Sequence, residues 1–244
     1  MSIKGLTTLS LVDWDGVVCA TVFVGGCNFR CPWCQNAPLV IPSNKIKIGT
    51  IYPEKLLQDI EGLGKYIEGI CISGGEPTFN QDLCKLLEGI KKLGLKTKLD
   101  TNGSRPDVIF ELLNRELVDY YAMDIKAPFV TEKYSKVTGC KFRDEWLTMF
   151  LDSISLIMKA APDYEFRTTV VPTLHTVKDI EQIAKYAIKG AKKYVIQNFW
   201  NAGELINKRY ANVQSFNRTE LEAFAEAAKP YIKEVKIRDV SHKS

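Results

Sequence analysis

Strand-like and helix-like patterns alternate six times along this chain of 244 residues, and the alternation constrains the fold more than any other feature. Segment 16–24 has apolar and β-branched residues at both odd and even positions, which suits a strand buried on both faces. Each strand-like segment is followed by apolar residues at helical spacing, and several of these helical patterns begin at a proline or stop at a glycine. Six such units in a row favour a parallel sheet with helical crossovers. The expected strands are 16–24, 68–73, 95–101, 118–125, 164–171 and 193–197.

This pattern fits either an open doubly wound sheet or a partial barrel, and periodicity does not choose between them. In both folds ligands bind at the carboxyl ends of the strands, so the residues that follow each strand are the functional candidates. No change in composition suggests a linker, and we expect one domain over residues 1–244 with its core at about 16–200. A C-terminal helix and strand, over 201–244, are expected to cap that core.

Seven cysteines in a chain of this length indicate a reduced compartment rather than a secreted, disulfide-stapled protein. The number is odd, and 244 residues bury a core without disulfides. Segment 1–15 has no apolar targeting core, and the most apolar run, 17–24, is far shorter than the roughly 20 residues of a membrane span. A net charge of +4 is small for a dedicated nucleic-acid binder. We therefore expect a cytoplasmic protein that binds neither membranes nor nucleic acids.

Three of the cysteines follow the first strand with C-x3-C-x2-C spacing, at Cys27, Cys31 and Cys34. On a short irregular loop three thiolates can converge on one metal centre, and thiolates select zinc or iron–sulfur clusters. A closed structural site takes four ligands. Three clustered cysteines therefore leave one coordination position open, at the edge of the sheet where ligands are expected.

A closed site completed by a remote cysteine is the alternative. Cys19 is poorly placed because it lies up to roughly 25 Å upstream along a strand. Cys71 lies within a strand, where a single cysteine is typically a small buried apolar residue. Cys84 and Cys140 fall on a helix and in a loop without a partner motif. The chain has two histidines, one of them His175, and their scarcity argues against histidine-based catalysis.

Polar residues also follow the later strands. Gly74, Gly75 and Glu76 end the second strand, where glycines let backbone carbonyls approach an ammonium group of a ligand; a simple turn is the alternative. Asp124 and Lys126 share one face at the end of the fourth strand. They suit the hydroxyl and carboxylate groups of a ligand, whereas a partly exposed ion pair between them would contribute little.

The fifth strand carries Arg167, which needs a partner if it is buried. A bound carboxylate, Asp124 and solvent are all open as that partner. The remaining candidates at strand ends are Asp100, Thr101, Asn102 and Gln197.

The cysteine spacing, with Trp33 before the last cysteine, resembles the signature of radical S-adenosylmethionine (SAM) enzymes. The resemblance implies a partial (β/α)6 parallel barrel and one [4Fe-4S] cluster held by Cys27, Cys31 and Cys34. It also implies that SAM chelates the open iron and that one-electron reduction cleaves SAM to a 5′-deoxyadenosyl radical, which abstracts hydrogen. The residues expected to contact the cofactor are Trp33, Gln35, Gly74, Gly75, Glu76, Asp100, Thr101, Asn102, Asp124, Lys126, Arg167 and Gln197.

Nearly the whole chain resembles one group of that family, the glycyl-radical-enzyme activases. Segments 5–14 and 22–34 are similar to activating proteins of anaerobic ribonucleoside-triphosphate reductase, and 73–77, 100–103 and 124–126 are similar to pyruvate formate-lyase activating enzyme. The resemblance implies hydrogen abstraction from a glycine of a partner glycyl radical enzyme, here an anaerobic ribonucleotide reductase. It also implies a one-electron donor such as flavodoxin or ferredoxin.

Two positions depart from the activase pattern: Asp15 stands where proline is frequent, and Gln35 where histidine often follows the last cysteine. No second cysteine-rich segment is present, so one cluster is expected. Two other functions remain open. One is a radical SAM enzyme acting on a small molecule, such as a 7-deazaguanine-type nucleoside precursor, or on a peptide; the other is a non-enzymatic metal-binding module. The basic groups expected as solvated surface, although they could attract an acidic donor, are Lys91, Lys92, Lys96, Lys98 and the tail 229–243.

Overall fold

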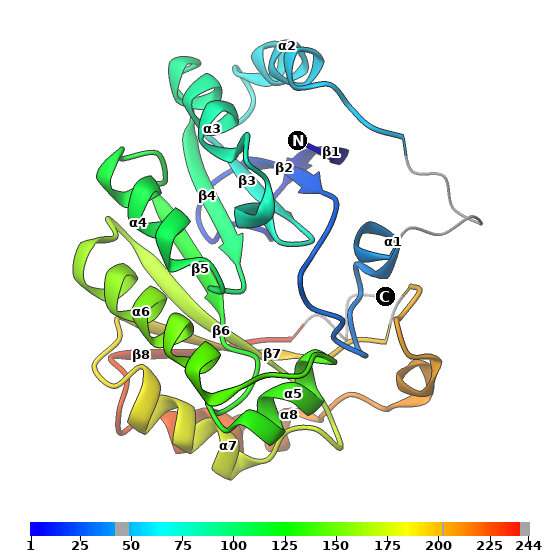
Figure 1. Cartoon of the computed structure of the whole chain (residues 1–244), viewed down its shortest axis with the longest axis vertical. Helices are drawn as coiled ribbons and strands as arrows, with labels where there is room; N and C mark the ends of the chain where they lie inside the picture. Colours follow the sequence, from blue (N-terminus) through cyan, green and yellow to red (C-terminus); the bar gives the residue numbers. More distant parts are fainter. Residues whose placement is uncertain (42–48, 202, 240–244) are drawn as a thin grey trace.

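The computed structural model describes residues 1–41, 49–201 and 203–239. At its centre is one eight-stranded sheet whose strands follow one another in sequence order from one edge to the other (Figure 1). The strands are β1 (Ile3–Ser10), β2 (Cys19–Val24), β3 (Gly69–Gly74), β4 (Lys96–Thr101), β5 (Tyr120–Asp124), β6 (Tyr164–Val170), β7 (Lys193–Asn198) and β8 (Glu234–Arg238).

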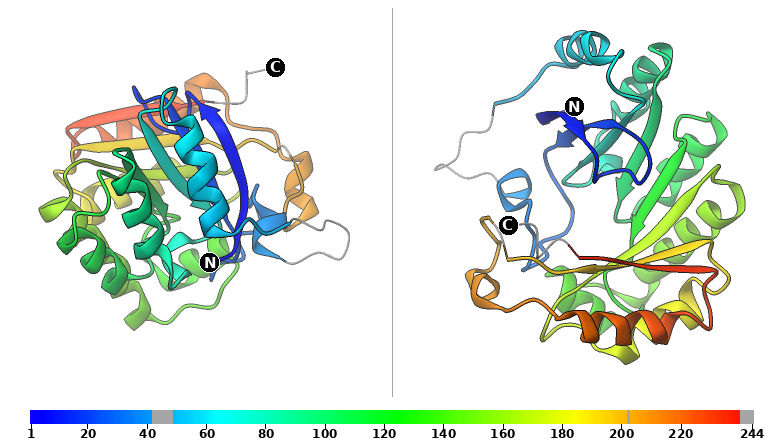
Figure 2. Two further views of the ribbon diagram at one scale, coloured as in Figure 1. Left: turned by 90° about the horizontal axis from the view of Figure 1, so that it is seen from above. Right: turned by 180° about the vertical axis from the view of Figure 1, so that it is seen from behind.

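Strands β2 to β8 run parallel, and β1 alone runs antiparallel, with Ile3 opposite Val24 and Ser10 opposite Cys19. The sheet curves round strongly, as the two views of Figure 2 show. In the described part of the chain no ladder joins β8 to β1, so one side of the barrel stays open. The six predicted parallel strands are confirmed as β2 to β7, and the fold is the partial barrel rather than a flat doubly wound sheet. The predicted C-terminal strand extends this sheet as β8.

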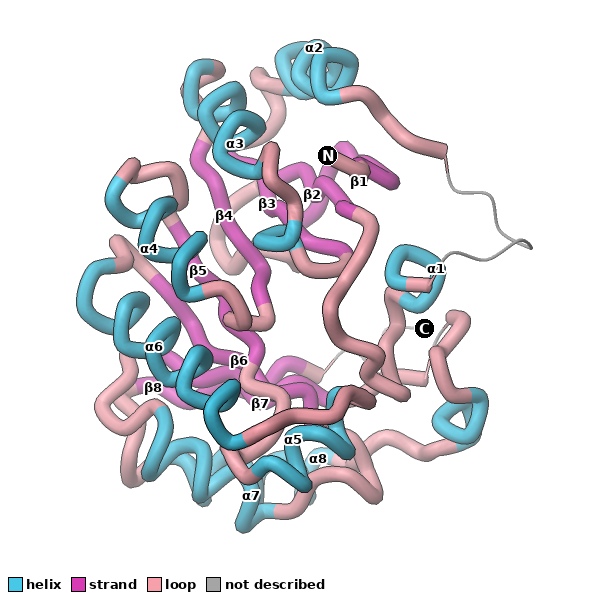
Figure 3. Tube along the Cα trace, viewed as in Figure 1, coloured by secondary structure: helices cyan, strands magenta, loops and turns pink. Residues whose placement is uncertain are grey.

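Helices cover the outside of the curved sheet (Figure 3). The crossover helices are α2 (Pro53–Leu63), α3 (Leu83–Lys92), α4 (Pro106–Asn114), α5 (Thr131–Thr138), α6 (Asp144–Ala160), α7 (Val177–Gln182) with a π-helical turn η2 (Ile183–Ala187), and α8 (Arg218–Ala228). Short helical turns follow three of the strands: α1 (Ala37–Val40) and the 3₁₀ turns η1 (Pro77–Phe79) and η3 (Lys208–Asn212).

Two elements were missed by the sequence analysis. Strand β1 buries only its first and last residues, Ile3 and Ser10, so it lacks the alternation that marks a half-buried strand. Helix α5 is similarly polar and ends at Gly139, whose φ of +69° is left-handed. A Cβ at Gly139 would lie 2.1 Å from the carbonyl oxygen of Arg30, so this turn packs directly on the cysteine loop.

The two faces of the sheet differ in chemistry. In β6, Phe166 and Val170 belong to the apolar core beneath the helices, whereas Arg167 and Thr169 line the interior of the barrel. The interior is therefore polar, and this overturns one prediction about the lysines. Lys98 is not solvated surface: its side chain is 2% exposed and its ammonium lies 2.9 Å from Asp100. The end of the basic tail, 240–243, lies outside the described residues.

Candidate active site

One cavity of about 520 Å³ lies at the carboxyl ends of the parallel strands. Every residue that the sequence analysis placed at the site lines this cavity. They are Cys27, Cys31, Trp33, Cys34, Gln35, Gly74, Gly75, Glu76, Asp100, Thr101, Asn102, Asp124, Lys126, Arg167 and Gln197. Residues from six strands or the loops after them thus meet in one place, as the edge rule for parallel sheets requires.

The cysteine loop leaves β2 at Gly25 and is held by main-chain hydrogen bonds. The amide of Gly26 donates to the carbonyl of Leu39 at 2.9 Å, and Gly26 in turn accepts from the amide of Glu76 at 2.8 Å. Cys31 is buried, while Cys27 and Cys34 are half-buried, and all three thiols are free. The loop therefore presents three sulfur atoms to the cavity on a backbone tied to the next strand's end.

The thiol arrangement fits a cluster better than a single metal ion. Within the described ranges, no three Cys, His, Asp or Glu side chains surround one point as a mononuclear site requires. The three thiols are nonetheless close enough that Cys27 and Cys34 affect the pKa of Cys31. In an iron–sulfur cluster each thiolate binds a different iron, so the sulfurs stand apart around a larger body. A closed structural zinc site, the earlier alternative, is thus poorly matched here.

Burial controls the protonation of these thiols. It raises the pKa of Cys27 to about 11 and that of Cys31 to about 12, and it also raises the pKa of Cys34. Lys126 opposes this effect as a nearby cation that lowers all three pKa values. Because a metal binds the thiolate form, loading the site must displace protons from these sulfurs.

The loop after β3 packs against the start of the cysteine loop without space for side chains. A Cβ on Gly75 would lie 1.9 Å from the carbonyl oxygen of Gly26, and Gly74 has a φ of +112°. The Gly74 carbonyl accepts a hydrogen bond of 2.8 Å from the Asn36 amide. Both glycines are therefore required by close backbone approach.

The Glu76 carboxylate is turned into the protein. It accepts hydrogen bonds from the amide of Thr78 at 3.1 Å and its hydroxyl at 2.6 Å, from the Thr101 hydroxyl at 2.7 Å and from the amide of Asn102 at 2.6 Å. Burial raises the pKa of Glu76, and these donors oppose that shift. Glu76 thus ties the loop after β3 to the end of β4.

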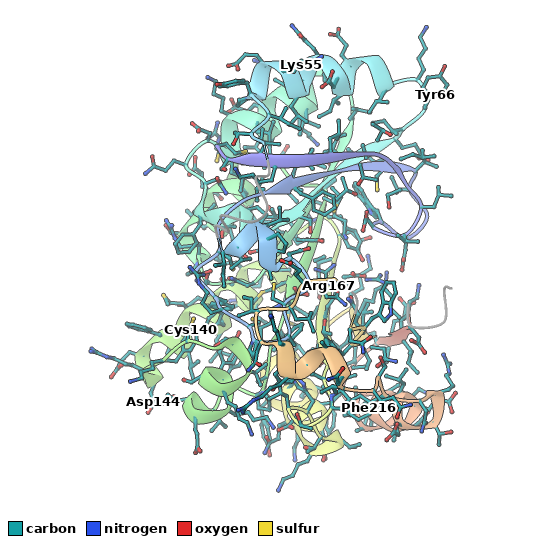
Figure 4. The ribbon with its side chains drawn as sticks, turned by 90° about the vertical axis from the view of Figure 1, so that its right-hand side faces the viewer. Lys55, Tyr66, Cys140, Asp144, Arg167 and Phe216 are labelled. Atoms are coloured by element: carbon teal, nitrogen blue, oxygen red, sulfur yellow. The ribbon has the colours of Figure 1, made fainter. Side chains whose placement is uncertain are left out.

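Arg167 is the centre of an ion network across the barrel. Its Nε lies 2.9 Å from Asp124 and its Nη1 lies 3.3 Å from Asp100. The partners of this buried guanidinium are therefore these two carboxylates. Lys126 lies 2.9 Å from the other oxygen of Asp124, and Lys98 lies 2.9 Å from Asp100. Burial alone would raise the pKa of Asp124, but Arg167 and Lys126 outweigh it and hold this pKa well below its usual range. Arg167, in the middle of the cavity side of β6, is labelled in Figure 4.

Lys126 connects this network to the cysteine loop. Its ammonium lies 5.3 Å from the ring centre of Trp33, whose indole N–H donates to the carbonyl of Val137 at 3.1 Å. Asp124 raises the pKa of Lys126 despite its burial, so the side chain stays charged. In the same loop, the side chain of Gln35 donates to the carbonyl of Trp200, which itself does not line the cavity.

Several lining residues were missed by the sequence analysis. Asp13 and Asp15 belong to the turn between β1 and β2, and Arg238 belongs to the last strand. Arg238 lies 3.3 Å from Asp15 and so links the two ends of the sheet across the open side. No local motif marks these residues, because only the closure of the sheet brings them together.

The sequence analysis assigned no role to His175, but in the structure this residue supports the main chain of the site. The amide of Val171 donates to Nδ1 at 3.0 Å, so Nε2 carries the proton and donates to the carbonyl of Lys126 at 2.8 Å. This buried, neutral ring fixes the main chain that carries Lys126.

A family model described as the radical SAM superfamily matches residues 21–187. The chain belongs to the radical SAM superfamily. This radical SAM enzyme therefore uses a [4Fe-4S] cluster and SAM, and the chemistry of the three thiols fits that cluster.

Two relatives bear on the reaction. A Methanocaldococcus jannaschii protein provisionally named a glycyl-radical enzyme activating enzyme is 33% identical over 241 residues, covering 98% of this chain and 96% of the relative. A 7-carboxy-7-deazaguanine synthase of Thermococcus kodakarensis is 26% identical over 191 residues, 70% of each protein.

Among solved structures, Streptococcus suis SuiB bound to SAM has a TM-score of 0.61 at 14% identity, covering 87% of this chain and 48% of SuiB. That likeness concerns the fold alone. No helix within the described ranges has both the length and the apolar character to cross a membrane.

Proposed function

We propose that this radical SAM enzyme is a glycyl-radical-enzyme activase whose partner is an anaerobic ribonucleotide reductase. The similarity to the M. jannaschii protein over 98% of this chain and 96% of that protein carries the proposal. The match extends over nearly the full length of both sequences, not over a shared cofactor-binding segment alone.

Cys27, Cys31 and Cys34 are proposed to hold the cluster. All seven cysteines lie within the described residues, and only these three line the cavity. When bound, cluster and SAM together supply the 5′-deoxyadenosyl radical that abstracts hydrogen. The protein's own contribution is to hold both groups in a pocket whose opposite wall admits the hydrogen donor.

Lys126 and Asp124 are proposed to bind polar groups of SAM, since they project into the cavity beside the cysteine loop. The carbonyl of Gly74 is proposed to accept from the SAM amino group, as it retains a lone pair beyond its bond with Asn36. Glu76 is assigned a positioning role instead of the direct contact first expected, because donors within the protein occupy its carboxylate.

The part of the cavity farthest from the cysteine loop is proposed to admit the glycine-bearing segment of the partner. It reaches the open side of the barrel at Leu11 and Val12, which are 70% and 54% exposed. Exposed apolar residues at a cavity rim are typical of a protein-binding surface. Asp15 and Arg238 flank the same opening.

The test is an anaerobic mixture of reconstituted enzyme, SAM, reductant and anaerobic ribonucleotide reductase, followed by electron paramagnetic resonance. We expect a glycyl radical on the reductase with wild-type enzyme and none with Cys31→Ala. A working cluster that cleaves SAM but leaves every tested reductase without a radical contradicts the activase assignment.

A small-molecule substrate is the second candidate, favoured by the charged lining and by the T. kodakarensis relative. Turnover of a 7-deazaguanine precursor by the loaded enzyme, in the absence of a protein partner, identifies that alternative. We further propose a cytoplasmic location, supported by the seven free thiols.

A further inference from the structure

The cysteine loop has an inner face and an outer face. Its inner face lines the cavity, and its outer face is covered by two segments distant in sequence. On one side the amide of Arg30 donates to the carbonyl of Thr138 at 2.9 Å, and the thiol of Cys140 lies 3.4 Å from the carbonyl of Asn28. On the other side the amide of Asn207 donates to the carbonyl of Pro32 at 2.8 Å.

Exposed cations surround this outer face. One of them belongs to the cysteine loop itself and one to α5. The other four come from the turn between α5 and α6 and from η3. We call these six residues the basic collar: Arg30, Lys136, Lys141, Arg143, Lys208 and Arg209. Figure 1 shows the blue cysteine loop between green α5 and the orange segment after β7. Figure 4 labels Cys140 and Asp144 on the green part of the chain, to the left of the orange segment.

The basic collar is not neutralised within the protein. None of its six cations lies within 4 Å of a carboxylate of the described residues. Glu132, Asp144, Glu145 and Glu204 are the carboxylates nearest in sequence, and Asp144 accepts from the Thr131 hydroxyl. Some cations elsewhere do have a partner, such as Lys91 with Asp119 at 2.8 Å. Six cations against four carboxylates leave the outer face with an excess of positive charge.

The collar is also in direct contact with the loop that carries the cysteines. The Arg30 guanidinium, itself exposed, donates to the carbonyls of Cys27 at 2.6 Å and Phe29 at 2.7 Å. Phe142 packs against Phe29 with ring centres 5.6 Å apart, and Arg143 lies 5.8 Å from the ring centre of the exposed Trp146. A protein seated on this surface would be separated from the cysteine loop by one layer of side chains.

We propose that the basic collar is the docking surface for an acidic one-electron donor protein of the flavodoxin or ferredoxin class. The donor is oxidised by one electron and the cluster is reduced by one, with no atom transferred. Because the inner face holds SAM and substrate, the outer face alone leaves both undisturbed during reduction. The proposal goes beyond the activase assignment, since any radical SAM reaction at this site needs that electron.

The charge distribution favours a protein donor over a nucleic acid. The collar alternates with carboxylates, and the whole chain has a net charge of only +4. Dedicated nucleic-acid surfaces carry a denser and longer basic stripe. A patch of this size is typical of transient electrostatic encounters, in which complementary charges raise the association rate.

The test uses the reconstituted holoenzyme and oxidised flavodoxin as the probe. Two double variants each replace two cations of the basic collar by carboxylates: Lys141→Glu with Arg143→Glu, and Lys208→Glu with Arg209→Glu. The matched control is Lys65→Glu with Lys189→Glu, which makes the same charge change at exposed sites before β3 and β7, at the opposite end of the barrel. Iron content and melting temperature establish that each variant is folded and loaded.

Binding is measured by calorimetry at about 50 and about 300 mM salt, where screening differs strongly. We expect each collar variant to raise the Kd about tenfold or more at low salt, and the control to stay within about twofold. The ratio of flavodoxin-driven to dithionite-driven SAM cleavage should fall by a similar factor. Wild-type affinity in both collar variants, an equal loss in the control, or binding of transfer RNA in place of flavodoxin overturns the proposal.

The two proposals fail separately. Dithionite-driven radical formation on a reductase tests the activase function without the collar. Flavodoxin binding tests the collar without any reductase.

Discussion

The two ends of the barrel interior contain the same residue types in opposite states. At the carboxyl end, Cys27 and Cys34 are half-buried and line an open cavity with Lys126. At the amino end, Cys19 and Cys71 are fully buried beside Trp14, within a small separate cluster. Cysteine content alone therefore does not identify the site.

The two ends differ in whether their polar side chains have partners within the protein. The thiol of Cys71 lies 4.0 Å from Lys98, whose ammonium is already taken by Asp100 and the carbonyl of Asp13. Glu165 is likewise enclosed by Tyr120 and Arg238. At the amino end Lys98 and Glu165 have partners within the protein, whereas the carboxyl end keeps three free thiols that line an open cavity. The free thiols at the carboxyl end can bind a cofactor, and the predictions below test this contrast between the two ends.

Removing a cysteine should have the largest effect, and only at the carboxyl end. Cys31→Ala deletes a proposed cluster ligand, so iron content should fall and SAM cleavage should drop to background. Cys71→Ala should retain both and lower the free energy of unfolding by about 1–2 kcal/mol, as a small core truncation. Iron analysis with 5′-deoxyadenosine detection measures this. Full cleavage by Cys31→Ala, or lost iron in Cys71→Ala, would break the contrast between the two ends.

Removing the central cation should cost the next most. Arg167→Ala leaves Asp100 and Asp124 in the interior without their shared partner, and loss of one member of a buried ion network costs about 3–5 kcal/mol. Arg105→Ala is the matched control, since its pair with Asp107 is exposed and is worth about 1 kcal/mol or less. Urea denaturation compares them. Equal losses for the two variants contradict a structural role for the network.

Adding one methyl group at the loop after β3 should have a smaller effect. In Gly75→Ala the new Cβ would meet the Gly26 carbonyl oxygen at 1.9 Å, and such overpacking costs about 1–3 kcal/mol. SAM affinity should fall too, because the cysteine loop must shift. Gly62→Ala is the control: it lies in α2 with open space around it and should stabilise by about 0.5–1 kcal/mol. Thermal melting and SAM titration distinguish the two; a neutral Gly75→Ala refutes the close packing.

The smallest expected effect is a pH dependence from His175. Burial lowers the pKa of His175, so the unfolded chain binds the proton more readily. Its contribution to stability is fully present above the unfolded pKa of about 6.5 and is lost as pH falls through the folded pKa. His175→Gln keeps a side-chain donor but does not titrate, so its unfolding free energy should fall less between about pH 7 and pH 5. Identical pH profiles would contradict the buried neutral ring.

Much of the fold and site was predictable because it depends on local signals. Buried parallel strands read as apolar runs, so β2 to β7 were found, and the residues after them had to meet at one edge. The three cysteines were marked by their spacing, and Gly74-Gly75 by its position at the end of a predicted strand. All fifteen predicted site residues line one cavity.

The missed parts depend on tertiary closure. Strand β1 is held by its pairing with β2, not by an apolar face of its own, and α5 buries little beyond Tyr134 and Val137. Asp15 and Arg238 are 223 residues apart and meet only because the sheet curls. Lys98 looked like surface because lysines usually are, and only a polar barrel interior reverses that expectation.

The central claim is that this enzyme takes hydrogen from a glycine of another protein. The most direct measurement uses anaerobic ribonucleotide reductase whose glycines carry deuterium at Cα, mixed with holoenzyme, SAM and reductant, with mass analysis of the 5′-deoxyadenosine released. The account predicts one deuterium in that product, formed together with the glycyl radical. Product without deuterium, at normal rates of SAM cleavage, would contradict it.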